Sequence, residues 1–577
     1  MKYTFFIFIP AKGNCYNIQR KYLRYINGKP LILYSIELAK KLTGNESIAI
    51  ITDDEEIDLI AKRASLRTVM IKDAKQFPNR FSGKHLIETL LKTETIIFKR
   101  FDYVIWMGAS SPMIKTRDVI EATQLLENSS NDSVFSASGE TQRGWMYDKT
   151  YQPGFVEIPN TMMAGVMHKE TGAFFIMKRS AIDESGYIGQ KATPFILHET
   201  RAVEIHSFND FWVAEKLLQR RLILFVVAGY SEIGMGHVYR ALMLAQEFHD
   251  HEVLFLCTYQ SQLAYNYISE HLYPVIMQKQ NEYLEEVVLR LSPDIVINDI
   301  LDTSKDYILS LKQEGIRTIN FEDQGEGSAY SDLVINALYE DAVSPNMLSG
   351  YEYFCLRSEF LTVSPKHLKG KVDNVLITFG GTDNNNLTWR ILKILLPLSL
   401  DYDFKICIVN GPGFAHRDSL KKFLFALSER DRRRVSWSED GTRQISEYMI
   451  ESDFAVTSAG RTVHELAALK VPTIVIAANV REQMHTFAIK AGMCFLGMHD
   501  DISDASIKNE VLSLITDSSK RKRIKDSLNK YDLTQGKKEV VGKILDILSI
   551  NDRQEKQAEK EPLSVTTSLY RCGYVDS

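Results

Sequence analysis

Short apolar runs alternate with amphipathic segments along most of the chain. Runs such as YTFFIFIP (3–10) predict buried strands, whereas the segments after them repeat apolar residues at helical spacing. In the first 220 residues we expect strands at 3–10, 47–54, 103–110 and 133–138, and helices at 30–41, 55–65, 116–127 and 210–220. This alternation predicts an α/β fold with a mostly parallel sheet, which binds ligands at the carboxyl ends of its strands.

A second strand, glycine loop and helix opens near the middle of the chain. The run Leu222–Val227 is followed by Gly229, Gly234 and Gly236, and then by apolar residues at helical spacing up to Phe248. Glycines allow a sharp turn and a close approach to a ligand, and the free N–H groups of the following helix favour an anion. His237 lies in the first helical turn and would face that ligand. A parallel-sheet turn without a ligand is the alternative interpretation.

Composition narrows the class of protein. A chain of 577 residues with 45% hydrophobic and 25% charged residues is typical of a soluble protein of two to four domains. The net charge of -5 predicts no nucleic-acid binding, and we interpret the basic clusters 430–434 and 520–525 as solvated helix faces. The first apolar run ends at Pro10, which predicts neither a signal peptide nor a membrane span, and six scattered cysteines suggest reduced thiols in a cytoplasm.

The stretch IPAKGNCYNIQRKYLRYINGKPLILYSIELA resembles the opening of the acylneuraminate cytidylyltransferases. Further matches are ITDDEEI at 51, SSPM at 110, DSVFSA at 132, TGAFFIMK at 171 and NDFWVAEKLL at 209. The resemblance implies a Rossmann-like nucleotidyltransferase domain that transfers CMP from CTP to a nonulosonic (nine-carbon sugar) acid, with Mg²⁺ on the phosphates. It places Lys21 as a catalytic residue and Lys12, Gly13 and Ser111 at the nucleotide.

This N-terminal segment departs from the family at the metal position. The family's Asp-Ile-Asp appears here as Glu204, Ile205 and His206. Glu204 and His206 are thus the expected metal ligands, and a histidine there would weaken Mg²⁺ binding or favour Mn²⁺. Asp210 follows in a pattern that is also typical of a helix cap.

The stretch GMGHVYRALMLA resembles the UDP-sugar hydrolase of the pseudaminic acid pathway and, more distantly, GT-B glycosyltransferases. PDIVINDILD (293–302), VLITFGGTDNNNLTWRIL (375–392) and SDFAVTSAGRTVHELAALKVPTIVIA (452–477) extend the match. The resemblance implies a two-lobed fold, with His237 taking a proton as UDP leaves and Glu465 accepting hydrogen bonds from the ribose. The remaining expected nucleotide-binding residues are Gly234, Gly236, Gly380, Gly381, Thr382, Ser458, Gly460, Thr462 and Gln483.

We therefore expect a cytidylyltransferase-like domain at 1–221, a GT-B-like N-lobe at 222–345, a C-lobe at 346–548 and a disordered tail at 549–577. The first hypothesis is a cytoplasmic bifunctional enzyme of nonulosonic acid biosynthesis that acts on CTP, a nonulosonic acid and a UDP-sugar, with a homodimer possible. The alternatives are a GT-B glycosyltransferase with a degenerate front domain, and a noncatalytic nucleotide-sugar binding protein.

Overall fold

The computed structural model divides the chain into two compact units, Met1–Arg220 and Arg221–Ser577, which are described separately. It describes residues 3–71, 86, 100–140, 145–148, 150–153, 167–182, 191–230, 233–341, 344–365, 368–411, 413–438 and 444–549. The predicted disordered tail at 549–577 lies outside the described residues from position 550 onward.

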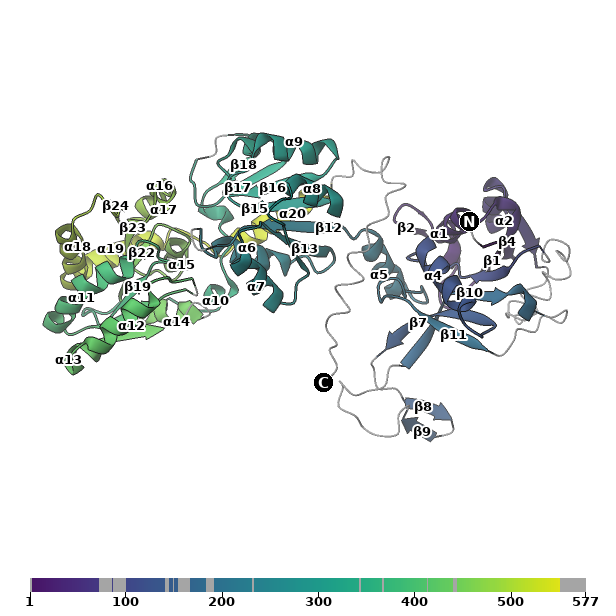
Figure 1. Cartoon of the computed structure of the whole chain (residues 1–577), viewed down its shortest axis with the longest axis horizontal. Coiled ribbons are helices and arrows are strands. Elements are labelled where there is room, and N and C mark those ends of the chain that lie inside the picture. The colour runs from purple at the N-terminus through teal and green to yellow at the C-terminus, as the bar shows by residue number, and fades with distance from the viewer. Residues whose placement is uncertain are drawn as a thin grey trace. The chain divides into compact units, whose positions relative to one another are not determined.

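The first unit is built on one seven-stranded sheet (Figure 1). Its order is β11 (Ala192–Ile196), β7 (Ser133–Glu140), β10 (Met167–Lys178), β6 (Tyr103–Met107), β1 (Phe5–Ala11), β4 (Ile48–Thr52) and β5 (Arg67–Met70). All neighbours run parallel except β10, which is antiparallel to both β6 and β7. The predicted mostly parallel α/β sheet is confirmed.

The helices of this unit follow the predicted segments. They are α1 (Leu31–Leu42), α2 (Glu55–Arg63), α4 (Thr116–Glu127) and α5 (Phe208–Leu218), with 3-10 turns η1 (Lys21–Leu23), η2 (Asn45–Ser47) and η5 (Arg179–Ala181). Two small antiparallel pairs join β2 (Tyr25–Ile26) to β3 (Lys29–Pro30) and β8 (Trp145–Asp148) to β9 (Thr150–Pro153). Because β1 and β6 are parallel neighbours, the loops after them meet at one edge of the sheet.

The second unit contains two parallel sheets, each the centre of one lobe. The first-lobe sheet has the order β14 (Val275–Met277), β13 (Glu252–Cys257), β12 (Leu222–Val227), β15 (Ile295–Asp299), β16 (Arg317–Phe321), β17 (Leu333–Asn336) and β18 (Met347–Ser349). Its helical segments are α6 (Gly236–Ala245), α7 (Gln262–Glu270), α8 (Leu284–Leu291), α9 (Lys305–Gln313), η6 (Glu326–Tyr330) and η7 (Tyr351–Tyr353).

The second-lobe sheet has the order β21 (Val435–Ser438), β20 (Lys405–Val409), β19 (Asn374–Thr378), β22 (Phe454–Ser458), β23 (Thr473–Ala477) and β24 (Cys494–Met498). The helices that follow the crossover from the first lobe are α10 (Ser358–Leu361), α11 (Leu387–Tyr402), α12 (Arg417–Ala426), α13 (Glu429–Arg432), α14 (Ile445–Glu451), α15 (Thr462–Ala468), α16 (Val480–Gln483), α17 (Phe487–Lys490), α18 (Asp504–Thr516), α19 (Ser518–Leu528) and α20 (Gly536–Ser549). The predicted two-lobed GT-B-like architecture of parallel sheets is confirmed.

The predicted lobe boundaries need correction at both ends of the second lobe. β18 pairs with β17 in the first-lobe sheet, although it falls after the expected boundary at 345/346. The last helix, α20, returns to the first lobe, where Val540 and Ile544 join its hydrophobic core (Figure 1). The chain crosses between the lobes twice, because the apolar face of α20 fits the first-lobe core rather than the second.

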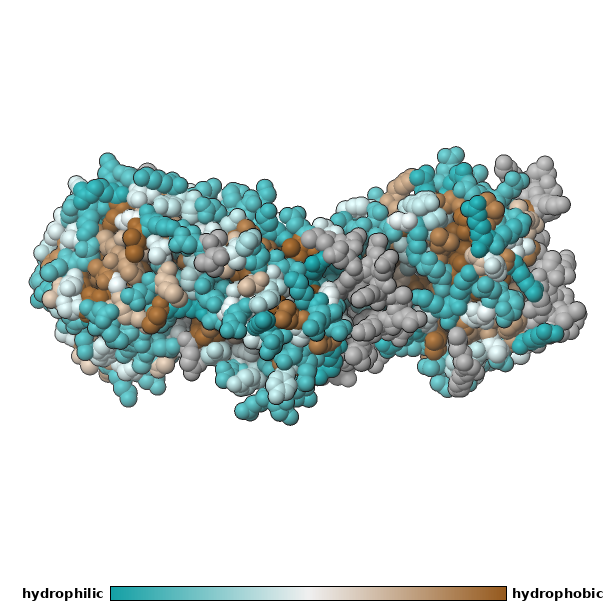
Figure 2. Space-filling model, turned by 90° about the horizontal axis from the view of Figure 1, so that it is seen from above, coloured by the Kyte–Doolittle hydropathy of each residue, from teal (hydrophilic) through white to brown (hydrophobic). Residues whose placement is uncertain are grey.

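The interpretation of 520–525 as a solvated helix face is wrong for one residue. Arg521 is fully buried, and its guanidinium donates to the backbone oxygens of Leu514, Lys369 and Gly370. Elsewhere, hydrophilic side chains dominate the face in Figure 2, and hydrophobic residues reach it in separate patches. Among the described residues, no helix combines the length and apolar character that crossing a bilayer requires.

Candidate functional sites

Lys21 is the centre of the candidate site in the first unit. It begins the η1 turn, and its side chain is buried at 7% exposure. The Lys21 Nζ donates to Ser110 Oγ at 3.0 Å and to the Ile205 carbonyl at 2.9 Å. Burial lowers the pKa of Lys21, opposed by the charges of Cys15, Glu204 and Asp210. The Lys21 ammonium thus connects the η1 turn to the loop after β6 and to the 204–206 segment.

The side chains of Glu204 and His206 are in contact. His206 Nε2 is 2.8 Å from Glu204 Oε2, and burial raises the pKa of Glu204 against the opposing charges of His206 and Lys21. Asp210 caps α5, accepting hydrogen bonds from the backbone N–H groups of His206 and Ser207. Within the described residues, no group of three or more His, Cys, Asp or Glu side chains could hold a metal ion. The pair supplies at most two protein ligands, so its metal role stays a prediction.

The other predicted residues of this site occupy the same sheet edge. Ser111 follows Ser110, and its buried Oγ lacks a hydrogen-bond partner within the described part of the chain. Gly13 N donates to Asp53 Oδ1 at 2.6 Å, which fixes the loop after β1 to the end of β4. Lys12 beside it is half-buried. A free hydroxyl and a fixed loop are compatible with a nucleotide, although their roles stay predictions.

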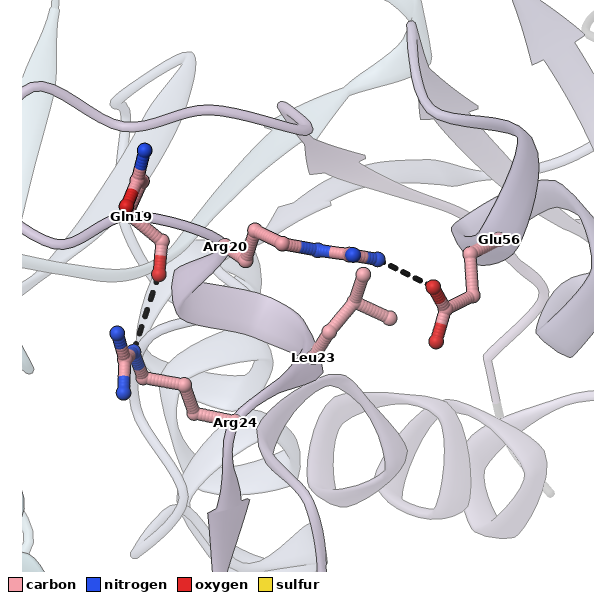
Figure 3. Close-up of a pocket in the computed structure, with 5 residues that line it drawn as sticks. All are labelled: Gln19, Arg20, Leu23, Arg24 and Glu56. Atoms are coloured by element: carbon pink, nitrogen blue, oxygen red, sulfur yellow. Dashed lines mark hydrogen bonds and ion pairs between the residues drawn. The ribbon is translucent and has the colours of Figure 1, made fainter.

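A cavity of about 290 Å³ lies on the outer side of the η1 turn, lined by Gln19, Arg20, Leu23, Arg24 and Glu56 (Figure 3). Figure 3 shows Arg20 extended toward Glu56, with which it forms an ion pair. Arg24 Nε donates to the Gln19 carbonyl at 3.0 Å. None of the predicted site residues lines this cavity, and the Arg20 charge is already compensated by Glu56.

In the second unit, His237 is held by a buried carboxylate. His237 lies in the first turn of α6, and Asp299 is the last residue of β15. His237 Nδ1 is 2.5 Å from Asp299 Oδ1. The two residues meet because β15 is the parallel neighbour of β12, with Val227 opposite Asp299 in the register. A proton on Nδ1 is favoured by this carboxylate, which leaves Nε2 as the proton acceptor.

Arg240 completes the support of this pair from one helical turn further along α6. Its Nε and Nη2 atoms donate to the two Asp299 oxygens at 2.7 and 2.6 Å, and its Nη1 donates to Glu322 Oε1 at 2.8 Å. Burial alone would raise the pKa of Asp299, but Arg240 and His237 lower it to about 2. Asp299 therefore stays ionised, and its charge fixes the imidazole.

Glu322 is held in an uncommon backbone conformation at the end of β16. Its φ angle of 53° places it in the left-handed region, although it is not glycine. Its carboxylate accepts from Arg240, and its backbone oxygen accepts from Arg481 of the second lobe. Arg481 also pairs with Asp302 at 3.2 Å. Strained residues of this kind persist where surrounding contacts hold them, often at functional sites.

The glycine loops of the two lobes meet beside His237. A Cβ atom built on Gly236 would lie 3.0 Å from Arg461 Cδ, so the second lobe fills the space that this glycine leaves open. A Cβ on Gly381 would lie 3.6 Å from Met235 N. Gly234 and Gly380 have φ angles of 78° and 74°, which favour glycine. The structure thus brings together loops more than 140 residues apart in sequence.

Of the remaining predicted nucleotide-binding residues, some are buried in the second lobe and one is exposed to solvent. Ser458 and Thr462 are buried on either side of Gly460 at the end of β22. Glu465 is buried, and its Oε1 accepts from Arg357 Nε at 3.1 Å, so the predicted ribose acceptor already has a cationic partner. Thr382 follows the Gly380–Gly381 turn. Gln483 is exposed at the end of α16.

Sequence reasoning missed most of the polar residues at this junction. Instead of Gln483, its neighbour Glu482 turns inward and accepts from the N–H groups of Ala459 and Ala478 at 3.2 and 2.9 Å. The residues not predicted are Asp299, Arg240, Glu322, Arg461, Arg357 and Glu482. Two signals pointed to Asp299 and Arg240: an acidic residue ending a buried strand, and an arginine three residues after the histidine.

Comparison with known proteins finds a matching family profile and several relatives of this chain. The cytidylyltransferase family profile matches residues 6–154. The uncharacterized protein MJ1062 of Methanocaldococcus jannaschii is 30% identical over 332 residues, which cover 52% of this chain and 67% of that protein. The spore coat polysaccharide biosynthesis protein SpsG of Bacillus subtilis is 24% identical over 300 residues, or 49% of this chain and 86% of the relative.

A third relative spans both units. The pseudaminic acid cytidylyltransferase and UDP-2,4-diacetamido-2,4,6-trideoxy-beta-L-altropyranose hydrolase of Helicobacter pylori is 22% identical over 506 residues, covering 81% of this chain and 87% of that protein. The family profile and these relatives define an enzyme whose first unit is a nucleotidyltransferase domain, joined to a second unit of two parallel-sheet lobes. Within that class, the chain belongs to the same family as MJ1062.

Proposed function

We propose that the chain is a bifunctional enzyme of nonulosonic acid biosynthesis. The first unit would transfer CMP from CTP to a nine-carbon sugar acid, and the second would hydrolyse a UDP-sugar. The observation that carries the proposal is the His237–Asp299 pair beside the two glycine loops, because it supplies an oriented base next to anion-binding backbone. The Helicobacter pylori relative, whose name joins both activities, supports the pairing of the units.

In the second unit, the chemistry follows from the orientation of His237. Its Nε2 accepts a proton from water while the water oxygen bonds to the anomeric carbon and the bond from that carbon to UDP breaks. Asp299 stabilises the imidazolium, and Arg240 keeps Asp299 ionised and in place. The glycine loops hold the diphosphate of the leaving UDP through backbone N–H groups.

In the first unit, Lys21 neutralises a triphosphate while the sugar hydroxyl attacks the α-phosphorus and pyrophosphate leaves. Ser110 and the Ile205 carbonyl orient the Lys21 ammonium, and the next residue, Ser111, has a buried hydroxyl without a partner among the described residues. A divalent cation, Mg²⁺ or Mn²⁺, would be held by Glu204 and His206 together with substrate phosphates, and it would neutralise phosphate charge. CTP and a nonulosonic acid are the substrates in this proposal.

The first test is incubation of the full-length protein with CTP, Mg²⁺ or Mn²⁺ and a panel of nonulosonic acids, followed by chromatography for a CMP-sugar and pyrophosphate. Lys21→Met should reduce product formation by about 100-fold or more. Lys62→Met is the matched control, because Lys62 forms an exposed ion pair with Asp58 on α2. Absence of a CMP-sugar with every acid and both metals would refute the proposal for the first unit.

The second test measures UDP release from UDP-sugars in water and with acceptor sugars. Hydrolysis predicts release without an acceptor and a loss of about 100- to 10,000-fold in His237→Asn. The control is His249→Gln, because His249 is exposed. Release that depends on an acceptor would assign glycosyl transfer to the second unit instead.

A further inference from the structure

Four arginines lie where the two lobes of the second unit meet. Three of them form ion pairs with carboxylates. The pairs are Arg240 with Asp299 and Glu322, Arg357 with Glu465 and Glu359, and Arg481 with Asp302. Paired charges of this kind are compensated, so these guanidinium groups need no further anion.

Arg461 is the exception among the four. No Asp or Glu carboxylate within the described residues forms an ion pair with it, and its Nη1 atom is buried without a hydrogen-bond partner. Its Nη2 donates to the Cys355 carbonyl at 3.0 Å, and its guanidinium lies over the Phe354 ring at 4.5 Å. Burial, followed by the nearby charge of Arg240, lowers the pKa of Arg461 to about 10, against the opposing charges of Cys355, Glu465 and Glu322.

This arrangement costs free energy unless an anion compensates it. A buried, unpaired donor on a charged group is penalised more than a neutral one, because the charge has lost its water. Backbone contacts to Cys355 and stacking on Phe354 orient the guanidinium but supply no negative charge. Arg461 therefore keeps one buried donor, Nη1, for which the described residues provide no acceptor.

The position of Arg461 indicates what kind of anion would fit. It directly follows Gly460, and its Cδ lies where a side chain on Gly236 would be. Gly236 begins α6, a ten-residue helix whose first N–H groups favour negative charge. Gly381 meets Met235 on the same loop. Three backbone loops and a guanidinium with one unpartnered donor thus lie at the same junction, an arrangement suited to the oxygen atoms of a diphosphate.

We propose that Arg461 is the cationic contact for the diphosphate of a nucleotide sugar bound between the two lobes. This inference rests on the proposed function of the second unit and adds a specificity-determining residue to it. Arg461 would recognise the diphosphate and not the nucleoside, so it would discriminate UDP from uridine.

Calorimetric titration of the full-length protein with UDP, UMP and uridine tests the proposal. Arg461→Met keeps the length and apolar contacts of the side chain but removes the charge. We expect UDP affinity to fall by about 10- to 100-fold, UMP affinity to fall less, and uridine affinity to change by less than about threefold. The control is Arg433→Met, since Arg433 is exposed and, within the described residues, pairs only with Glu429 on α13.

A second measurement guards against a folding defect. Inorganic pyrophosphate should raise the thermal unfolding temperature of the wild type and of Arg461→Lys, which retains the charge, but not that of Arg461→Met. Equal UDP affinity in Arg461→Met and wild type, or equal losses for UDP and uridine, would overturn the role of Arg461 alone. A wild-type protein that binds none of the three ligands would overturn both this inference and the proposed function.

Discussion

At the scale of single residues, the candidate site of the second unit is a series of four polar side chains in contact, which begins at His237. The imidazole contacts Asp299, Asp299 contacts Arg240, and Arg240 contacts Glu322. Each member is buried except for the partly exposed imidazole, whose side chain is 12% exposed. The one member of this group that solvent reaches is therefore His237, as its proposed role as the base requires.

Asp299→Asn tests this series of contacts. The variant keeps the shape of the side chain but removes the charge that orients His237, so kcat for UDP release should fall by about 100-fold or more with little change in KM. Loss of the partner of a buried arginine should also lower the free energy of unfolding by about 3 kcal/mol. Steady-state kinetics and urea unfolding measure the two effects.

The matched control for that variant is Asp306→Asn. Asp306 lies in the first turn of α9 and is exposed, so the kinetics should not change, and the free energy of unfolding should fall by less than about 1 kcal/mol through the lost helix-dipole interaction. An Asp299→Asn protein with wild-type kcat would show that the carboxylate has only a structural role.

The sequence points to some residues of these candidate sites and not to others, for a physical reason. His237, Lys21 and the glycines lie within a local strand, loop and helix, and that pattern is visible in a short window. Asp299 and Arg461 acquire their importance from sheet order and lobe packing, which bring distant segments together. Arg521 is a residue that the local pattern misplaces. Its segment has the basic pattern of an exposed helix face, yet Arg521 is buried and binds backbone oxygens of a loop distant in the sequence.

At the scale of elements, an aromatic stack joins the crossover segment to the second lobe. His464 lies between the rings of Phe354 and Phe487, at centroid distances of 4.3 and 4.2 Å and interplanar angles of 9° and 14°. Both ring nitrogens of His464 are buried without a hydrogen-bond partner in the described part of the chain. Burial, with the charges of Arg461 and His485, holds the pKa of His464 well below its usual 6.5.

That depressed pKa predicts acid sensitivity. Below pH 6.5 the unfolded chain takes up a proton at His464 that the folded chain does not, so stability falls as the pH falls. Between pH 7.5 and 5.5 the loss from this group is about 1 kcal/mol. His464→Phe should preserve the stack and make the urea midpoint less dependent on pH over this range, whereas His249→Gln should not. An unchanged pH dependence in His464→Phe would contradict the prediction.

The last helix provides a second prediction at this scale. Gly536 begins α20, and a Cβ there would lie 2.2 Å from the Phe354 carbonyl oxygen. Backbone cannot move aside cheaply, so Gly536→Ala should destabilise the second unit by about 1–3 kcal/mol. Gly542 in the same helix has nothing within 4 Å of such an atom. Gly542→Ala should therefore stabilise by up to about 1 kcal/mol, and equal effects of the two changes in urea unfolding would contradict the packing argument.

Element positions were easier to predict than the assembly of the lobes. β12 and α4 have the predicted bounds, since apolar runs and helical spacing are local properties. The assignment of β18 and α20 to the first lobe was not predicted, because an amphipathic helix does not specify which core it covers. The antiparallel β10 likewise depends on topology rather than on local pattern.

At the scale of the whole molecule, each candidate site draws its residues from one compact unit. Lys21, Ser110 and Glu204 belong to the first unit, whereas His237 and Asp299 belong to the second. The hydrophobic clusters divide in the same way, each containing residues of one unit only. This organisation predicts two reactions that do not share a catalytic group.

Crossed variants test that independence. Lys21→Met should abolish CMP-sugar formation and leave UDP-sugar cleavage within about twofold of wild type, whereas His237→Asn should do the reverse. The double variant should lose both activities, with each loss equal to that of the single variant, because sites without shared partners behave additively. Both rates are measured on the same full-length preparations. A single substitution that lowers both rates would show that the units act through one another and that neither reaction belongs to one unit alone.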